Sequence, residues 1–217
     1  MEQERIIENA VAALKAVGGD RARIGLILGS GLGGYAETLE NKRTVDYASI
    51  EGFPVSGVVG HSSRFVVGEK AGKTVIVMQG RFHYYEGYPQ SMLALGVRTM
   101  KRLGVESLLI TNAAGGVNFP AGTLMLISDH INLSGSNPLI GKNLDAFGPR
   151  FPDLSNVYDR ALRSRLKALA ECELRTRYHA HMGVKAFMSS HTSVVEKTVI
   201  WRLEQMEKMG EEMRNEE

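Results

Sequence analysis

Several features that mark large classes of protein are scarce in this 217-residue sequence. Its one cysteine, Cys172, cannot form an internal disulfide, which favours a reducing compartment. Positive and negative side chains nearly balance, 26 against 24, so composition gives no sign of the clustered cations that nucleic-acid binding requires. No run approaches the roughly 18 consecutive apolar residues of a membrane helix. The opening MEQERIIENA lacks the order of a signal peptide, so we expect a cytoplasmic protein without nucleic-acid or membrane partners.

Apolar residues, at 43%, and charged residues, at 23%, have the proportions of an ordinary globular chain. Glycine is plentiful, with 24 residues, and the glycines follow apolar runs rather than forming a low-complexity tract. No repeat or linker divides the chain, so we expect a single domain over 1–217. Periodicity predicts strands at 24–28, 64–68, 74–78, 107–111 and 124–127, and helices at 3–17, 90–103, 160–175 and 192–214. Helices that alternate with buried strands predict an α/β fold.

A glycine-rich segment, ILGSGLGG at 27–34, follows the first predicted strand. Glycines let backbone N–H groups point at an anion, and Ser30 adds a hydroxyl donor. A strand-to-helix turn without a ligand explains this segment equally well. A second segment, VVGHSSRFVVG at 58–68, places His61 at the start of a strand, where a histidine can bind an anion or move a proton, although a lone one is more often a surface residue.

The segment MQGRFHYYEGYP, at 78–89, is the densest in chemical groups, and it also follows a predicted strand. Arg81 offers a planar fork of donors that matches phosphate oxygens. Tyrosine rings offer faces for a sugar together with hydroxyl donors. A tyrosine-rich surface loop is the alternative, but so many ionisable and aromatic groups at a strand end favour a functional role.

A fourth segment, LLITNAAGGVN at 108–118, ends a buried strand in small residues that leave backbone amides open to an anion, although a tight packing corner would look the same. Ligands in α/β folds bind beyond the carboxyl ends of strands. Ser30, His61, Arg81 and the amides of 112–116 therefore predict a phosphate site. Tyr85, His83 and Glu86 could hold a polyhydroxylated group beside it.

Two further patterns are weaker evidence for a functional site. His179 and His181 resemble a metal pair, but no cysteine or carboxylate stands at a helpful spacing, so an incidental pair is the better interpretation. Cys172 lies inside a predicted helix, which favours a packing role over a nucleophilic one. We therefore expect no metal.

The order of these segments resembles the purine nucleoside phosphorylase family of the homotrimeric type. ILGSGLGG, GHSSRF, GRFHYYEGY and TNAAGG match its signatures, and FGPRFPDLSNVYD at 147–159 matches a further one. The resemblance implies a central mixed β-sheet flanked by helices. It also implies phosphorolysis, in which a purine nucleoside and phosphate give the free base and ribose 1-phosphate. Phosphate is then a co-substrate, and no metal or organic cofactor is needed.

Matched motif by motif, the resemblance assigns phosphate binding to Ser30, His61, Arg81 and the amide of Ala113.

The resemblance also assigns the sugar side of the site. His83 and Glu86 are expected to act at the reacting centre, with His83 also lining the sugar pocket. Tyr85 is expected to cover the ribose. Phe147 is expected to lie at the surface and to reach the sugar pocket of a neighbouring subunit in a homotrimer. His191 resembles the histidine that meets the 5′ end of the sugar.

The resemblance covers about residues 5–175 and then falters. The family's Gly-Pro-Ser-Phe-Glu-Thr stretch, whose glutamate binds the purine, and its later Thr-Asn stretch, whose asparagine holds the base, are not found in this sequence. We therefore expect a sheet that is incomplete near the C-terminus, a divergent or shortened part at 178–217, and poor turnover. A relative that binds phosphate without catalysis is the alternative.

Overall fold

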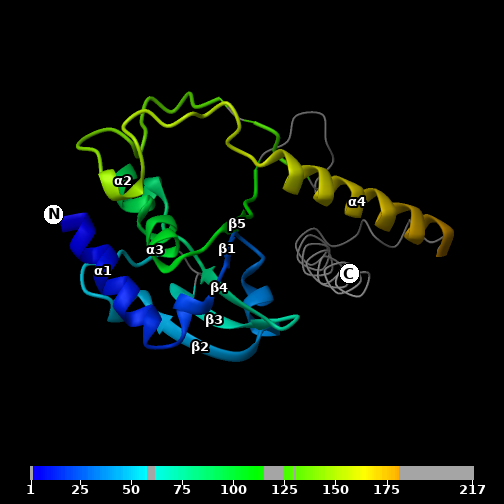
Figure 1. Cartoon of the computed structure of the whole chain (residues 1–217), viewed down its shortest axis with the longest axis horizontal. Helices are drawn as coiled ribbons and strands as arrows, with labels where there is room; N and C mark the ends of the chain where they lie inside the picture. The colour runs from blue at the N-terminus through cyan, green and yellow to red at the C-terminus, as the bar shows by residue number, and fades with distance from the viewer. Residues whose placement is uncertain (1, 58–61, 115–124, 130, 181–217) are drawn as a thin grey trace. The chain divides into compact units, whose positions relative to one another are not determined.

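The chain forms a mixed five-stranded sheet within residues 24–110 (Figure 1). Its strands are β1 (Ile24–Leu28), β2 (Glu40–Asp46), β3 (Arg64–Lys70), β4 (Lys73–Gln79) and β5 (Ser107–Ile110). They lie in the order β2-β3-β4-β1-β5. β4, β1 and β5 run parallel, whereas β3 is antiparallel to both β2 and β4. Three neighbouring strands therefore end at the same edge of the sheet.

The computed structural model describes residues 2–57, 62–114, 125–129 and 131–180, and only the backbone of 171–180. The chain falls into two compact units. The first, 1–113 with 133–150, contains the sheet, and the second, 114–132 with 151–217, contains the long helix α4 (Arg160–Ala180). A single domain over 1–217 stays a prediction.

Four of the five predicted strands are confirmed. The apolar runs of β1, β3 and β4 are buried, whereas β5 lies at an edge of the sheet and is only partly buried. The fifth prediction, 124–127, is wrong for its described part. Residues 125–127 form no strand, and Met125 and Leu126 are 67% and 47% exposed. An apolar run is therefore not enough to form a strand when no neighbouring strand pairs with it. Strand β2 was missed, because its sequence ENKRTVD buries only Val45.

Three of the four predicted helices are present with shifted ends. α1 spans Glu2–Lys15, and the helix predicted at 90–103 is divided at Ala94 into α2 (Gln90–Leu93) and α3 (Leu95–Leu103). The helix predicted at 192–214 lies outside the described residues. Short 3₁₀ helices occur at η1 (Gly19–Arg21), η2 (Gly33–Thr38), η3 (Tyr47–Ser49), η4 (Tyr84–Glu86) and η5 (Asp145–Phe147).

Two helices and an aromatic cluster fill the core of the first unit. α1 and α3 pack against each other (Figure 1). The cluster is formed by Tyr47, Phe53, Phe65 and Phe82, with the Tyr47 and Phe65 ring centroids 4.9 Å apart. The buried Tyr47 hydroxyl donates to the Gly80 carbonyl at 2.8 Å. The core thereby holds the backbone directly before Arg81.

The core also contains one polar atom without a partner. The Thr99 side chain is fully buried in α3, and within the described part of the chain its Oγ1 makes no hydrogen bond. Because a buried hydroxyl without a partner is unfavourable, Thr99→Val should leave the free energy of unfolding unchanged or raise it by about 1 kcal/mol. Urea denaturation followed by circular dichroism would measure this. A clear loss of stability would show that Thr99 has a partner among the remaining residues.

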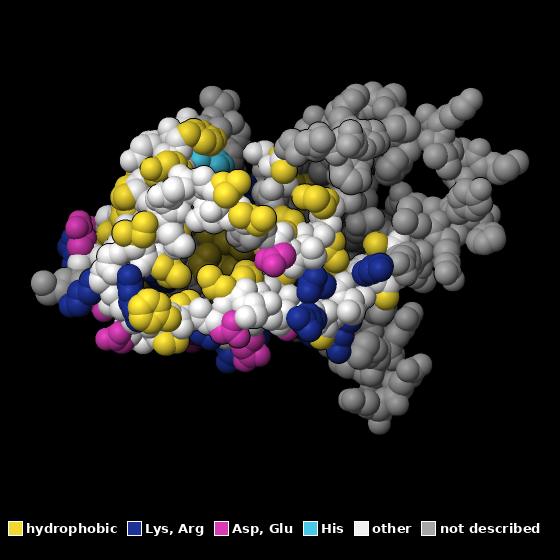
Figure 2. All heavy atoms as spheres, turned by 90° about the horizontal axis from the view of Figure 1, so that it is seen from above, with side chains coloured by type: hydrophobic (Ala, Val, Ile, Leu, Met, Phe, Trp, Pro, Cys, Tyr) yellow, Lys and Arg dark blue, Asp and Glu magenta, His cyan; other side chains and the backbone are white. Residues whose placement is uncertain are grey.

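No helix in the described ranges is both long and apolar enough to cross a membrane. Hydrophobic side chains nevertheless reach the surface over much of one face (Figure 2). Among the most exposed are Ile131, Leu133 and Phe151, each more than 80% exposed.

Candidate anion-binding site

The candidate site lies where β4, β1 and β5 end. Pairing is in register up to Leu28 opposite Gln79 and Ile27 opposite Ile110. The segments that follow these strands, 29–34, 80–88 and 111–114, are therefore neighbours although they are far apart in the sequence. The strand ends share one edge of the sheet, which is where ligands bind in α/β folds, and the phosphate site itself stays a prediction.

The glycine-rich loop, residues 29–34, approaches the end of β5 closely. A Cβ atom on Gly29 would lie only 2.5 Å from the Thr111 carbonyl oxygen, so no other residue fits there without movement. The Gly29 amide donates to Thr111 Oγ1 at 2.9 Å. Ser30 follows and is exposed, and Gly31 adopts a positive φ of 82°. The loop thus presents a hydroxyl and glycine backbone at the edge of the sheet.

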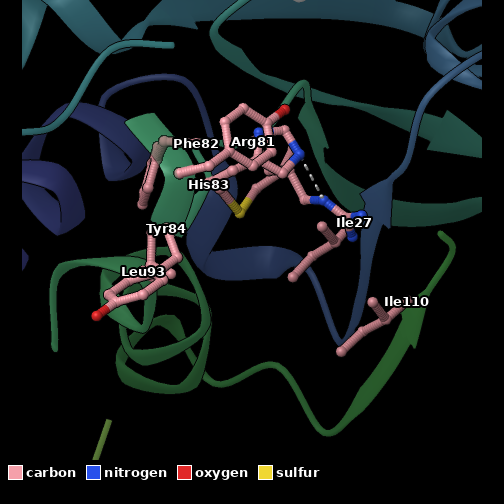
Figure 3. A pocket seen from close by; sticks show the side chains of 9 residues that line it. Ile27, Arg81, Phe82, His83, Tyr84, Leu93 and Ile110 are labelled. Atoms are coloured by element: carbon pink, nitrogen blue, oxygen red, sulfur yellow. Dashed lines mark hydrogen bonds between the residues drawn. The ribbon is translucent and has the colours of Figure 1, made fainter. Parts of the chain in front are cut away.

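Arg81 lies between the ends of β4 and β5. Its Nη1 donates to the Thr111 carbonyl at 3.2 Å, and its Nε donates to His83 Nε2 at 3.4 Å (Figure 3). Desolvation by burial lowers the pKa of Arg81, but a guanidinium remains charged at neutral pH. The partly buried cation at the strand ends is suited to an anion.

His83 and Glu86 form a pair held by the backbone. His83 Nδ1 lies 2.9 Å from Glu86 Oε1, and their side chains are only 17% and 11% exposed. A neutral imidazole with its proton on Nδ1 satisfies both this contact and the one from Arg81. Glu86 also accepts from the His83 amide at 2.7 Å and from Ser56 and the Gly57 amide at 2.9 Å. Burial raises the pKa of Glu86, but these hydrogen bonds outweigh burial and hold its pKa below the usual value.

A hollow of about 370 Å³ opens beside these groups. Its apolar lining includes Ile27, Met78, Phe82, Leu93 and Ile110, and its polar lining includes Arg81 and His83 (Figure 3). Tyr85 stacks on His83, with ring centroids 4.8 Å apart and an interplanar angle of 12°. Because Tyr85 is 74% exposed, its other face is open to a ligand.

The geometry can be compared with known proteins. The model of the phosphorylase superfamily matches residues 23–212. Purine nucleoside phosphorylase 1 of Bacillus subtilis is 53% identical over 167 residues, which cover 76% of this chain and 62% of that protein. Purine nucleoside phosphorylase 1 of Geobacillus stearothermophilus is 53% identical over 183 residues, covering 82% and 67%. The chain belongs to the purine nucleoside phosphorylase family.

Solved structures of the family agree with the fold. The Schistosoma mansoni purine nucleoside phosphorylase in complex with inosine superposes with a TM-score of 0.71 at 40% identity, covering 77% of this chain and 60% of that one. The described part of this chain therefore has the sheet architecture of the family. The chain spans about three fifths to two thirds of the length of these relatives.

The structure brings together most of the family-matched residues that it describes. Ser30, Arg81, His83, Glu86 and Tyr85 follow adjacent strands with Ala113, which lies three residues beyond the end of β5. His61 and His191 lie outside the described residues. The roles of all these residues stay predictions.

Phe147 lies differently from the sequence expectation of a surface ring. It ends η5, is half-buried and packs against the core of its own chain. The Arg98 guanidinium lies over the ring, 5.9 Å from its centroid. The exposed aromatic ring of this segment is instead Phe151, at 87% exposure. A role for Phe147 in a neighbouring subunit stays a prediction.

Sequence reasoning missed the polar residues that support the site: Gln79, Thr111 and Ser56. Gln79 carried a usable signal, because it ends the otherwise apolar buried run VIVM. Ser56 carried none, because its bond to Glu86 joins residues 30 positions apart. Among the described residues no cluster of histidine, cysteine and carboxylate could hold a metal ion.

The lowered pKa of Glu86 predicts a pH dependence. Because the folded-state pKa lies below the ordinary value of 4.5, the Glu86 hydrogen bonds stabilise the fold above that pH and are lost as the pH falls through the folded-state pKa. Glu86→Gln should therefore be less stable than the unsubstituted protein at about pH 7, and the difference should shrink at about pH 3.5. Urea unfolding at the two pH values measures this. A difference independent of pH would contradict it.

Proposed function

We propose that this protein is a purine nucleoside phosphorylase that converts purine ribonucleosides or deoxyribonucleosides and inorganic phosphate into the free base and the sugar 1-phosphate. The observation that carries the proposal is the position of Arg81, beside the glycine-rich loop and the His83–Glu86 pair at the ends of three parallel strands. Arg81, Ser30, His61 and the Ala113 amide are the proposed phosphate ligands. Inorganic phosphate is the co-substrate, and no further cofactor is proposed.

The proposed reaction exchanges one bond for another at the anomeric carbon. A phosphate oxygen bonds to this carbon while the bond to the purine nitrogen breaks, and the base leaves with the bonding electrons. Positive charge develops on the sugar in the transition state. A bound phosphate dianion would therefore attack the anomeric carbon and also stabilise this charge. Arg81 would orient this anion, while Tyr85 would cover the sugar from its open ring face. The His83–Glu86 pair would hold the sugar–phosphate side of the site.

Solved structures of relatives support the proposed substrate and product. Schistosoma mansoni purine nucleoside phosphorylase is known in complex with inosine, and its isoform 2 in complex with cytosine and ribose 1-phosphate. Both are at least 40% identical to this chain over 77% of its length.

We propose in addition that turnover by this chain is low. The family segments that bind the purine are not found in the sequence. A single donor to the transition state is worth roughly 10²–10³ in rate, so the loss of two leaves little catalysis. The second candidate function is a relative that binds phosphate and nucleoside without turnover, and the same observation favours it.

One assay decides between the two candidates. Release of hypoxanthine from inosine is measured with and without phosphate, using the 217-residue chain. Slow but phosphate-dependent release is expected. A rate in the enzyme-typical range of about 1–10³ s⁻¹ would contradict low turnover. No phosphate-dependent release at all would favour binding without catalysis. Which purine base is preferred depends on the segments not found.

A homotrimer in the cytoplasm is the proposed context of the site. The highly exposed Phe151 lies in the segment FGPRFP that matches the family, and an exposed aromatic ring on such a loop favours an interface. Three copies related by a three-fold axis form a closed ring. Light scattering at micromolar concentration should give three times the 23.8 kDa mass of one chain. A stable monomer would contradict the assembly.

A further inference from the structure

Two side chains attach the glycine-rich loop to the strands on either side of β1. Gln79, the last residue of β4, donates through Nε2 to the Gly33 carbonyl at 2.8 Å. Thr111, directly after β5, accepts from the Gly29 amide through Oγ1 at 2.9 Å. Ser30 lies between these two attachment points. The loop is therefore held at its beginning by one neighbouring strand and near its end by the other.

Gln79 is fixed by more than one bond. Its side chain is 4% exposed, and its Oε1 accepts from Arg64 Nε at 2.6 Å. Its Nε2 also donates to Glu37 Oε1 at 3.0 Å, and Arg64 Nη2 donates to the same oxygen at 2.9 Å. Lys42 completes this group by donating to Glu37 Oε2 at 2.9 Å. These bonds hold the Gln79 amide with its Nε2 directed at the loop.

Thr111 connects the loop to Arg81. Its hydroxyl donates to the Ile27 carbonyl at 3.2 Å while it accepts from Gly29, so both of its roles are used. Its own carbonyl accepts from Arg81 Nη1 at 3.2 Å. A change at Thr111 therefore alters the relation between the loop and the cation of the site.

The composition of β4 indicates that Gln79 does more than fill space in the core. The four residues before it, Val75–Met78, are all buried and apolar. A buried amide is unfavourable unless its donors and acceptor are bonded. Among the described residues, the Gln79 side chain bonds to Gly33, Glu37 and Arg64, and an apolar residue would have filled the same volume without these bonds.

We propose that Gln79 and Thr111 are positioning residues, which hold the glycine-rich loop from two sides and so set Ser30 and the neighbouring amides for phosphate. The inference rests on the proposed function, since it assigns these residues to the phosphate side of that site. Neither residue needs to touch the anion. The two act through the loop backbone, and Thr111 acts also through Arg81.

The test uses the full chain with Gln79→Met and Thr111→Val, each of which removes hydrogen bonds at nearly constant volume. Thr99→Val is the matched control, because it makes the same change at a buried threonine that does not contact the loop. Hydrogen exchange of the amides of 29–35 is measured without phosphate. Phosphate affinity is then measured by calorimetry. Should Gln79→Met not fold, Gln79→Glu keeps the acceptor for Arg64 and loses the donor to Gly33.

We expect faster exchange in 29–35 and about three- to tenfold weaker phosphate binding in both variants, and neither effect in the control. Variants that only lose thermal stability, with unchanged exchange in the loop and unchanged affinity, would overturn the proposal. The unsubstituted protein is titrated first. Failure of that protein to bind phosphate would contradict the proposed function and the positioning role together, whereas binding that the variants do not weaken would contradict the positioning role alone.

Discussion

Replacing Arg81 with alanine is expected to weaken phosphate binding by one to two orders of magnitude. Charge-assisted hydrogen bonds contribute roughly 1.5–3 kcal/mol each, and about 1.4 kcal/mol corresponds to a factor of ten. Because Arg81 also contacts Thr111 and His83, the substitution removes both a ligand of the anion and a link between two strand ends. Isothermal titration calorimetry with inorganic phosphate measures the change.

Two variants sharpen this result. Arg81→Lys keeps the positive charge but loses the planar fork, so its affinity should fall between that of the unsubstituted protein and that of Arg81→Ala. Arg102→Ala removes an arginine that pairs with Glu8 between α3 and α1, and it should leave phosphate affinity unchanged. Equal losses in Arg81→Ala and Arg102→Ala would reduce the effect to net charge and would contradict a site at Arg81.

The second large effect is expected for Gly29→Ala. The added Cβ would lie 2.5 Å from the Thr111 carbonyl oxygen and 2.9 Å from the Asn112 Cα, both of them backbone atoms that cannot swing aside. Overpacking of this kind costs typically about 1–3 kcal/mol of stability. The loop must also move away from β5, so phosphate affinity should fall together with the free energy of unfolding. Urea denaturation and calorimetry measure the two quantities.

Gly33→Ala in the same loop is the matched control. Of the described residues, its Cβ would meet only Gln79, whose Cγ lies at the ordinary contact distance of 3.9 Å. We expect nearly unchanged stability and phosphate affinity. If Gly29→Ala were as well tolerated as Gly33→Ala, the close approach of the loop to β5 would not exist in solution.

Local sequence signals predicted four of the five strands but not β2, which lies at one edge of the sheet. β1, β3 and β4 each contain a continuous apolar run, as expected for strands that are buried on both faces. β2 has the sequence ENKRTVD and becomes a strand only because β3 offers it a pairing edge, which no local pattern records. The reverse holds for 125–127, which is apolar but pairs with nothing in the described part of the chain. In both cases, the availability of a neighbouring strand decided whether the segment formed a strand.

Some residues of the candidate site could likewise be predicted from local sequence, and others could not. Arg81, His83 and Glu86 could be found because one short segment contains them after a strand. Gln79 and Thr111 could not be assigned to the loop, because their bonds to Gly33 and Gly29 join residues 46 and 82 positions apart. The half-burial of Phe147 likewise depends on Arg98 and the core, which only the folded chain brings together.

A phosphate titration of the ¹⁵N-labelled protein followed by nuclear magnetic resonance tests the central claim most directly, because it locates the anion. The account predicts that the amides of Ser30, Gly31 and Ala113 and the side-chain Nε–H of Arg81 shift together with one dissociation constant. These groups follow β1, β5 and β4, so a common response requires a site at the three strand ends. Shifts confined to other cationic surfaces, such as the arginines of α4, or no saturable shifts at all, would contradict the account.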